Sequence, residues 1–222
     1  DSLLHEVVSL ASALQAGQGA GQVGPLIDNI AKQRVLQYIQ DSENNGARIL
    51  LDGRSWAARE KGFWIGPTVI LHNSAEDKAM KDEIFGPVLS VYRVSTREEA
   101  IAIENANPYG NAGCIYTERG CNAEWFTKRF RAAMLGVNIG IPVPREPFSF
   151  GGLYGTMSKY GNSDITGDGA MEFFTNRIKI TTKWTASYGT GSGGAQPAAK
   201  RARVENGTPS AAIEDKANFD GR

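Results

Sequence analysis

Residues 88–116 read VLSVYRVSTREEAIAIENANPYGNAGCIY, and this stretch decides the fold class. Residues 88–94 are rich in Val, Leu and Tyr, which predicts a strand. Residues 95–99 hold a Ser-Thr pair followed by two Glu, a capping box that predicts a helix over 100–106. The Asn-Pro-Tyr-Gly that follows should end this helix, and residues 113–116 should form the next strand.

A second helix and a third strand continue the alternation. Asn122 can cap a helix that runs to Met134, because large apolar residues recur there at near-helical spacing. Gly136 can end that helix, and residues 136–139 should form a strand. Alternating strands and helices with short connections predict an α/β fold with a parallel sheet and right-handed crossovers.

The region before this stretch should supply two helices and two strands. Residues 2–16 carry Leu and Val at helical spacing. A helix over 28–44 should begin at the N-cap Asp28. Its buried stripe should consist of Ala31, Val35, Tyr38 and Ile39. Short strands are predicted over 49–51 and 67–71.

The last part of the chain changes character. Residues 148–168 are rich in Gly, Ser and Tyr and should form an ordered loop. Residues 177–184 alternate polar and apolar, as in a strand with one buried face, and we expect them to pair across a subunit interface. Residues 185–222 are dominated by Gly, Ala, Ser and Pro, which predicts a disordered tail. The basic run at 197–204 resembles a nuclear-import signal only weakly.

Composition excludes several classes of function. The 222 residues include 24 Lys or Arg and 24 Asp or Glu, so the net charge gives no reason to expect a nucleic-acid partner. No stretch approaches the apolar length of a membrane span. Cys114 and Cys121 are too few for a disulfide framework, and neither they nor His5 and His72 have metal-ligand spacing.

The motif EIFGPV at 83–88 holds the candidate site. The Glu83 carboxylate can accept hydrogen bonds from the two vicinal hydroxyls of a ribose, and Phe85 offers a face for a flat ring. Gly86 allows close backbone approach, and Pro87 fixes the entry to the strand. By chemistry alone, Glu83 is more simply a solvated surface charge.

The motif and its neighbours resemble the aldehyde dehydrogenase superfamily. The order of Gly24-Pro25-Leu26-Ile27, Gly66-Pro67-Thr68, EIFGPV, Asn107-Pro108-Tyr109-Gly110 and Gly136-Val137-Asn138 matches that family from about residue 2 to 184. The resemblance implies the C-terminal half of a catalytic domain over 1–170, an oligomerisation strand over 171–184 and a disordered tail over 185–222.

GVNIGIPVP at 136–144 and FSF at 148–150 are most similar to the methylmalonate-semialdehyde dehydrogenase branch, although Gly151-Gly152 follows the wider superfamily pattern. The resemblance implies NAD-dependent oxidation of malonate or methylmalonate semialdehyde. Coenzyme A would take the acyl group, giving acetyl-CoA or propanoyl-CoA with loss of carbon dioxide. A homo-oligomer assembled through the final strand and a mitochondrial location are implied in the same way.

By resemblance, Glu83 holds the nicotinamide-side ribose and Phe85 packs near the nicotinamide. Arg34 corresponds to a cation near the adenine ribose, although a solvated helix charge is the simpler interpretation. Phe150 resembles an aromatic of the aldehyde tunnel, or else it is a loop residue packed on the core.

No catalytic residue is expected in this chain. The family's nucleophilic Cys lies in a G-Q-x-C segment, which we expect upstream because the chain begins at Asp1 without a Met. The chain alone should therefore be inactive. The alternative is a non-catalytic half-domain that binds full-length dehydrogenase subunits. A standalone dinucleotide-binding module fits poorly, because no GxGxxG follows a predicted strand.

Overall fold

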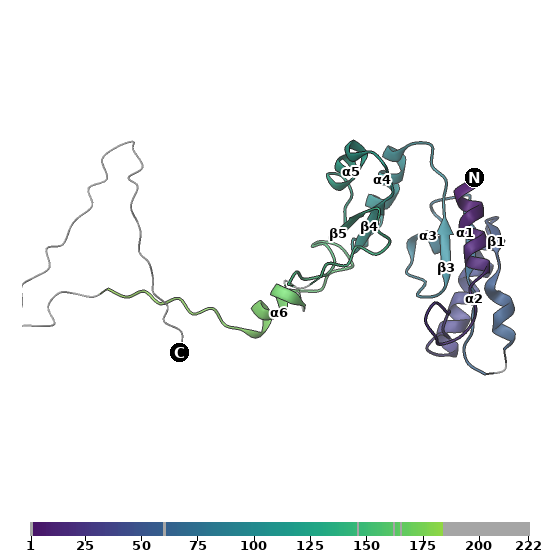
Figure 1. Ribbon diagram of the computed structural model, residues 1–222, viewed down its shortest axis with the longest axis horizontal. Helices are drawn as coiled ribbons and strands as arrows, with labels where there is room; N and C mark the ends of the chain where they lie inside the picture. The colour runs from purple at the N-terminus through teal and green to yellow at the C-terminus, as the bar shows by residue number, and fades with distance from the viewer. Residues whose placement is uncertain (1, 60, 146, 162, 165, 184–222) are drawn as a thin grey trace, which may run out of the picture. The chain divides into compact units, whose positions relative to one another are not determined.

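The computed structural model describes residues 2–183 except 60, 146, 162 and 165 (Figure 1). The chain divides into two units, Asp1–Asn176 and Arg177–Arg222. The elements in chain order are α1 (Ser2–Ser12), α2 (Asn29–Asn44), β1 (Arg48–Leu51), the 3-10 helix η1 (Gly53–Ala58), β2 (Thr68–Leu71), α3 (Lys78–Lys81), β3 (Val88–Val91), α4 (Arg97–Ala106), β4 (Ala112–Ile115), α5 (Gly120–Thr127), β5 (Met134–Val137) and α6 (Gly167–Phe174).

The first sheet has the order β1-β2-β3. β2 and β3 are parallel, with Thr68 opposite Val88 and Leu71 opposite Val91. β1 is antiparallel to β2, with an irregular register between Ile49 and Leu51. The parallel pair confirms the expected sheet type, whereas the antiparallel β1 departs from it.

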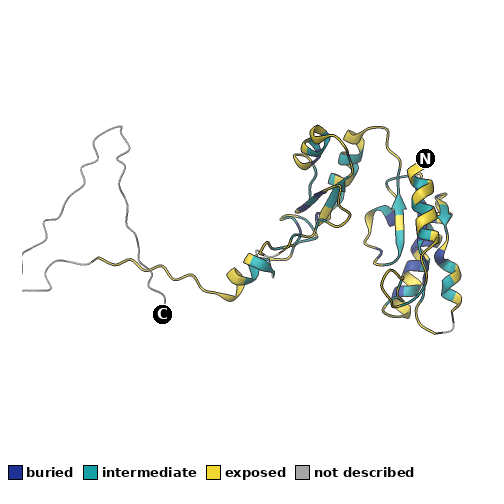
Figure 2. Cartoon of the chain, viewed as in Figure 1, coloured by how far each residue is buried: buried dark blue, intermediate teal, exposed yellow. Residues whose placement is uncertain are grey.

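The main core lies where α2 packs with the first sheet and the segment before β3. The α2 stripe is buried as predicted, and Val35 and Ile39 are fully inaccessible to solvent. Burial of these side chains stabilises the unit by roughly 1.5–3 kcal/mol each. The buried cluster consists of Val35, Tyr38, Ile39, Ala47, Ile65, Ile70, Ala79 and Ile84, drawn dark blue in Figure 2.

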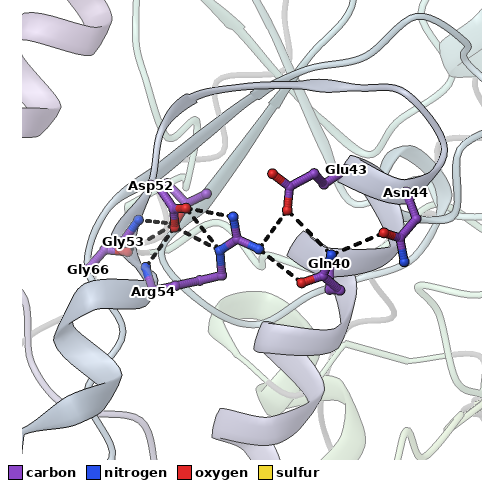
Figure 3. Close-up of polar contacts among 8 residues, drawn as sticks. Gln40, Glu43, Asn44, Asp52, Gly53, Arg54 and Gly66 are labelled. Carbon is purple, nitrogen blue, oxygen red and sulfur yellow. Dashed lines mark hydrogen bonds and ion pairs between the residues drawn. The ribbon is translucent and has the colours of Figure 1, made fainter.

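Helix α2 begins and ends with polar contacts. The Asp28 side chain accepts a hydrogen bond from the backbone N–H of Ala31 at 2.7 Å, which confirms the predicted N-cap. Near the other end, the Arg54 guanidinium contacts Glu43 Oε2 at 2.8 Å and Gln40 Oε1 at 3.2 Å (Figure 3). Arg54 also donates to both carboxylate oxygens of Asp52, and this contact holds the pKa of Asp52 below its ordinary value. The cluster ties α2 to η1.

The second sheet consists of the parallel strands β4 and β5, with Cys114 opposite Gly136. The predicted capping box is present at α4: Thr96 Oγ1 accepts from Glu99 N at 3.1 Å, and Glu99 Oε2 accepts from Ser95 N at 2.8 Å. Asn138 follows β5 with φ 56°, a conformation that Asn tolerates better than most residues.

The described strands thus form two separate sheets rather than the one continuous sheet that the alternation suggested. Helix α5 is also shorter than predicted, since it ends at Thr127 and not at Met134, which begins β5. The backbone N–H groups of Arg131 and Ala133 donate to Asn105 Oδ1 and Gly110 O, so they are not available to continue the helix.

Two expectations for the C-terminal part need correction. Residues 171–174, assigned to the oligomerisation strand, belong to α6, and Gly167–Asp168 at its start were assigned to a loop. Within the described part of the chain, residues 177–183 are not assigned to a strand, so the strand across a subunit interface remains a prediction. The proposed tail at 185–222 lies outside the described residues. None of the described helices is long and apolar enough to cross a membrane.

Candidate functional site

The candidate site is the stretch Glu83 to Gly86, between α3 and β3. Ile84 points into the core and is only 8% exposed. Glu83 and Phe85, on either side of it, are exposed. One buried anchor therefore places the two predicted cofactor contacts on the surface.

Phe85 has an unusual backbone conformation. Its φ is 56° and its side chain is 76% exposed, although a bulky residue avoids the left-handed region. Such strain costs on the order of 1–3 kcal/mol and concentrates at ligand-binding sites. A large ring that is both strained and solvent-facing buries little apolar surface in this chain, which favours a role in binding.

Glu83 makes no hydrogen bond or ion pair with the other described residues. Its side chain lines a hollow of about 460 Å³ that Asp82, Tyr109 and Arg131 also line. The Arg131 guanidinium donates to the Asn107 carbonyl at 2.9 Å. The Glu83 carboxylate thus keeps its acceptor capacity for a ligand.

Gly86 and Pro87 join the site to the sheet. A Cβ on Gly86 would lie 2.7 Å from Val35 Cγ2, so the backbone here passes closer to α2 than any side chain would allow. Pro87 O accepts from Thr68 N at 2.9 Å, which extends the β2–β3 pairing by one residue. Strand entry at Pro87 is confirmed, and the close approach that Gly86 allows is an approach to α2.

The arrangement fits the nicotinamide half of a dinucleotide. The Glu83 carboxylate can accept from both hydroxyls of a ribose, and the Phe85 ring can lie against a flat heterocycle. Both groups are exposed and come from adjacent positions on one backbone segment. The residues present are therefore chemically suited to NAD.

Arg34 lies on α2, and its Nη2 donates to the Ile84 carbonyl at 3.3 Å. The structure thus links Arg34 to the candidate site through the backbone, and its contact with the adenine ribose stays a prediction. Tyr38, one turn further along, donates its hydroxyl to Asp82 Oδ2 at 2.7 Å. The sequence predicted only a core position for Tyr38, and its spacing of four residues from Arg34 was the only signal of this second role.

Phe150 is 46% exposed, and its backbone N–H donates to Thr166 Oγ1 at 3.2 Å. Neighbouring Ser149 accepts from Gly169 N at 2.8 Å, which ties this loop to the first turn of α6. These contacts do not bring Phe150 to Glu83 or Phe85. Its role in an aldehyde tunnel stays a prediction.

The cysteines and histidines supply no further centre. Cys114 is half-buried on β4 and Cys121 is exposed near the start of α5. His72 is buried with its Nδ1 3.2 Å from Asp77 Oδ2, whereas His5 is exposed. Within residues 2–183, gaps excepted, no group of three or more His, Cys, Asp or Glu could hold a metal ion.

Comparison with known proteins gives a consistent result. The aldehyde dehydrogenase family model matches residues 1–180. Malonate-semialdehyde dehydrogenase 2 of Geobacillus kaustophilus and malonate-semialdehyde dehydrogenase 1 of Geobacillus thermodenitrificans are each 39% identical over 188 residues. In both cases the match covers 83% of this chain and 38% of the relative. The chain therefore spans about two fifths of the length of these relatives.

Solved structures agree with this comparison. The crystal structure of methylmalonate-semialdehyde dehydrogenase from Oceanimonas doudoroffii superposes with a TM-score of 0.79 at 35% identity, covering 84% of this chain and 39% of that one. Mycobacterium tuberculosis aldehyde dehydrogenase complexed with NAD⁺ gives a TM-score of 0.69 at 30% identity, covering 79% of this chain and 36% of that one.

Proposed function

The chain belongs to the aldehyde dehydrogenase family, and from this premise we propose that its Glu83–Gly86 segment contacts the nicotinamide half of NAD. The proposal extends to an enzyme that oxidises malonate or methylmalonate semialdehyde with coenzyme A as acyl acceptor. The names of the relatives support the aldehyde, and the NAD-bound structure supports the cofactor. The observation that carries it is the exposed, strained Phe85 beside Glu83, whose carboxylate has no partner among the residues that the structure describes.

In this proposal, the residues of this chain bind and orient the cofactor. Glu83 accepts hydrogen bonds from the ribose hydroxyls, and Phe85 limits the positions that the nicotinamide ring can take. NAD, when bound, accepts the hydride of the aldehyde carbon. For methylmalonate semialdehyde, NAD⁺ and CoA-SH, the products are propanoyl-CoA, carbon dioxide and NADH, which balances atoms and charge. By orienting the nicotinamide ring, Phe85 would hold it close to the aldehyde carbon, and such proximity lowers the barrier to hydride transfer.

The test begins with the native protein, isolated with an antibody to residues 185–222. NADH formation is followed with malonate or methylmalonate semialdehyde, with and without CoA. CoA-dependent NADH formation by the wild type supports the proposal. Its absence from a folded, NAD-binding protein would contradict the proposed activity.

The Glu83→Ala variant tests the site itself. Because a hydrogen bond to a charged group contributes about 1.5–3 kcal/mol, we expect KM for NAD⁺ to rise about tenfold or more. Glu118→Ala removes another exposed carboxylate and should leave KM unchanged. Equal KM values in the two variants would exclude a ribose contact at Glu83.

The second candidate is a non-catalytic partner of full-length dehydrogenase subunits. The intact mass of the native protein separates the two. A mass about twice that of this chain, with a G-Q-x-C segment, supports the enzyme, whereas a mass near 23.9 kDa supports the partner.

A further inference from the structure

We infer that α2 positions the cofactor-contacting segment through Arg34, Tyr38 and Ser42, which we call the α2 ladder. The inference rests on the proposed function, because the segment it positions carries Glu83 and Phe85. In the structure, the three residues donate hydrogen bonds to the backbone and carboxylates of the segment. They are positioning residues. This positioning is separate from the predicted contact of Arg34 with the adenine ribose.

The spacing of the ladder places it on one face of the helix. Residues four apart on an α-helix lie above one another, so positions 34, 38 and 42 form a row. At about 1.5 Å per residue, this row is about 12 Å long. A row of this length can contact several points of a chain segment that runs alongside α2. The segment from Asp77 to Gly86 runs in this way.

Each member of the ladder contacts a different point of this segment. Ser42 Oγ donates to Asp77 Oδ1 at 3.3 Å, at the start of α3. The Tyr38 hydroxyl donates to Asp82 Oδ2 at 2.7 Å. The Arg34 guanidinium donates to the carbonyl of Ile84 at 3.3 Å. The segment is thus antiparallel to α2.

The last two contacts lie on either side of Glu83, and the Ile84 carbonyl belongs to the peptide that leads into Phe85. Asp82 precedes Glu83, and Ile84 separates it from Phe85. Because hydrogen bonds hold both Asp82 and Ile84, the backbone of Glu83 between them has a fixed position, and its carboxylate extends from that position. When the Ile84 carbonyl is held, the peptide plane that sets φ of Phe85 cannot rotate freely. The ladder therefore opposes relaxation of the left-handed conformation.

Apolar packing supports the same geometry. Gly86 lies so close to Val35 that a Cβ would be 2.7 Å from Val35 Cγ2, and Ile84 is buried in the core cluster beside Val35. The chain is thus fixed on both sides of Phe85. A strained residue persists only where its surroundings over-determine its conformation, and these contacts meet that condition.

Tyr38 makes the strongest contact of the ladder. Its partner is a carboxylate, and a hydrogen bond to a charged group is stronger than one between neutral groups. The hydrogen bond to Asp82 is the main reason that the pKa of Tyr38 is raised, with burial adding to it. The hydroxyl therefore stays protonated and donating throughout the neutral pH range.

Three variants remove single contacts of the ladder: Tyr38→Phe, Arg34→Met and Ser42→Ala. Tyr38→Phe deletes one oxygen and keeps the ring in the core. Tyr160→Phe is its matched control, because Tyr160 is 92% exposed. Arg48→Met is the control for Arg34→Met, since Arg48 is an exposed residue of β1. All are made in the full 222-residue chain, uniformly labelled with ¹⁵N and ¹³C.

The first measurement reports the conformation of Phe85 directly. A residue with positive φ gives a strong cross-peak between its own amide and Hα protons in a ¹⁵N-edited NOESY spectrum. We expect this cross-peak in the wild type and both controls, and its weakening in Tyr38→Phe and Arg34→Met. Ser42→Ala should weaken it least, because its contact is furthest from Phe85.

The second measurement is the affinity for NAD⁺, from amide shifts of Glu83 and Phe85. Loss of a positioning hydrogen bond should raise Kd about fivefold in Tyr38→Phe and leave it unchanged in the controls. Arg34→Met is judged by the Phe85 cross-peak, because Arg34 also has a predicted contact with the adenine ribose. Thermal unfolding shows what fraction of each variant is folded at the titration temperature. A merely structural role would lower the melting temperature without changing the Kd of the folded molecules.

An unchanged Phe85 cross-peak in Tyr38→Phe and Arg34→Met, with an unchanged Kd in Tyr38→Phe, would overturn the inference. If Glu83 and Phe85 of the wild type do not respond to NAD⁺, the proposed function of this segment fails separately. In that case the cross-peak still tests whether the α2 ladder positions Phe85. Its loss in the variants supports positioning by α2, and its persistence contradicts it.

Discussion

At the scale of single residues, Phe85 connects conformation with function. The sequence predicted that its ring serves a ligand, but not that its backbone is left-handed, because no sequence pattern marks positive φ at a Phe. Gly86, the residue with freedom for such a conformation, is needed instead for close contact with Val35. The strained backbone conformation is therefore adopted by Phe85 and not by the neighbouring glycine.

Replacing Phe85 with Gly should raise the free energy of unfolding and lower the affinity for NAD⁺. Gly adopts positive φ without a steric penalty, and little packing is lost from an exposed ring, so the chain should become more stable by about 1 kcal/mol. Affinity for NAD⁺ should fall at the same time. Chemical denaturation measures the first effect and amide-shift titration the second. Phe148→Gly, at another exposed Phe, should not gain stability, and a loss of stability in Phe85→Gly would refute the strain.

Gly53 is a second residue whose side chain is excluded by geometry. A Cβ there would lie 1.9 Å from the Gly66 carbonyl oxygen, and that neighbour is backbone that cannot turn aside. Gly53→Ala should therefore cost about 1–3 kcal/mol in the free energy of unfolding. Gly120→Ala, where no atom lies within 4 Å of the added Cβ, is the control and should cost nothing. Equal unfolding midpoints in urea would contradict the close approach.

At the scale of elements, local signals succeeded where tertiary contacts agreed with them. The Asp28 and Thr96 caps were predictable because each uses a side chain within three residues of the N–H it binds. Helix α5 was over-extended because Phe126 and Phe130 keep helical spacing beyond its end, with ring centroids 4.9 Å apart. The two rings pack against each other although the helix has ended, and the backbone N–H of Arg131 donates to the Asn105 side chain instead of continuing the helix.

The contact between η1 and α2 through Arg54 should make stability depend on pH. Arg54 holds the pKa of Asp52 below its ordinary value, so the folded state gains from the charged carboxylate. This gain is present above about pH 4 and is lost as the pH falls through the lowered pKa. The difference in unfolding free energy between wild type and Asp52→Asn should therefore shrink in acid. It should be modest, because Asp52 is half-exposed.

Urea unfolding of both proteins from pH 7 down to pH 3 measures this difference. Asp168→Asn, at a carboxylate outside the Arg54 cluster, serves as the control. A difference between wild type and Asp52→Asn that stays constant across the range would show that Arg54 does not stabilise the charged form.

At the scale of the whole molecule, family membership and the α/β class were predictable, because both depend on ordered local motifs. The division of the strands into two sheets was not, since pairing partners are set by non-local contacts. The same holds for the candidate site. Glu83 and Phe85 could be named from their motif, but the part played by Tyr38 depends on a contact between residues 44 positions apart.

In the proposed function, Glu83 and Phe85 contact the nicotinamide half of NAD. The most direct measurement is a search for NOE contacts between NAD⁺ and the chain, with the Phe85 ring selectively labelled. We predict cross-peaks from the nicotinamide protons to the Phe85 ring and from the adjoining ribose to Glu83, both lost in Glu83→Ala. Binding of NAD⁺ with contacts only to other residues, or with the adenine against Phe85, would contradict the claim.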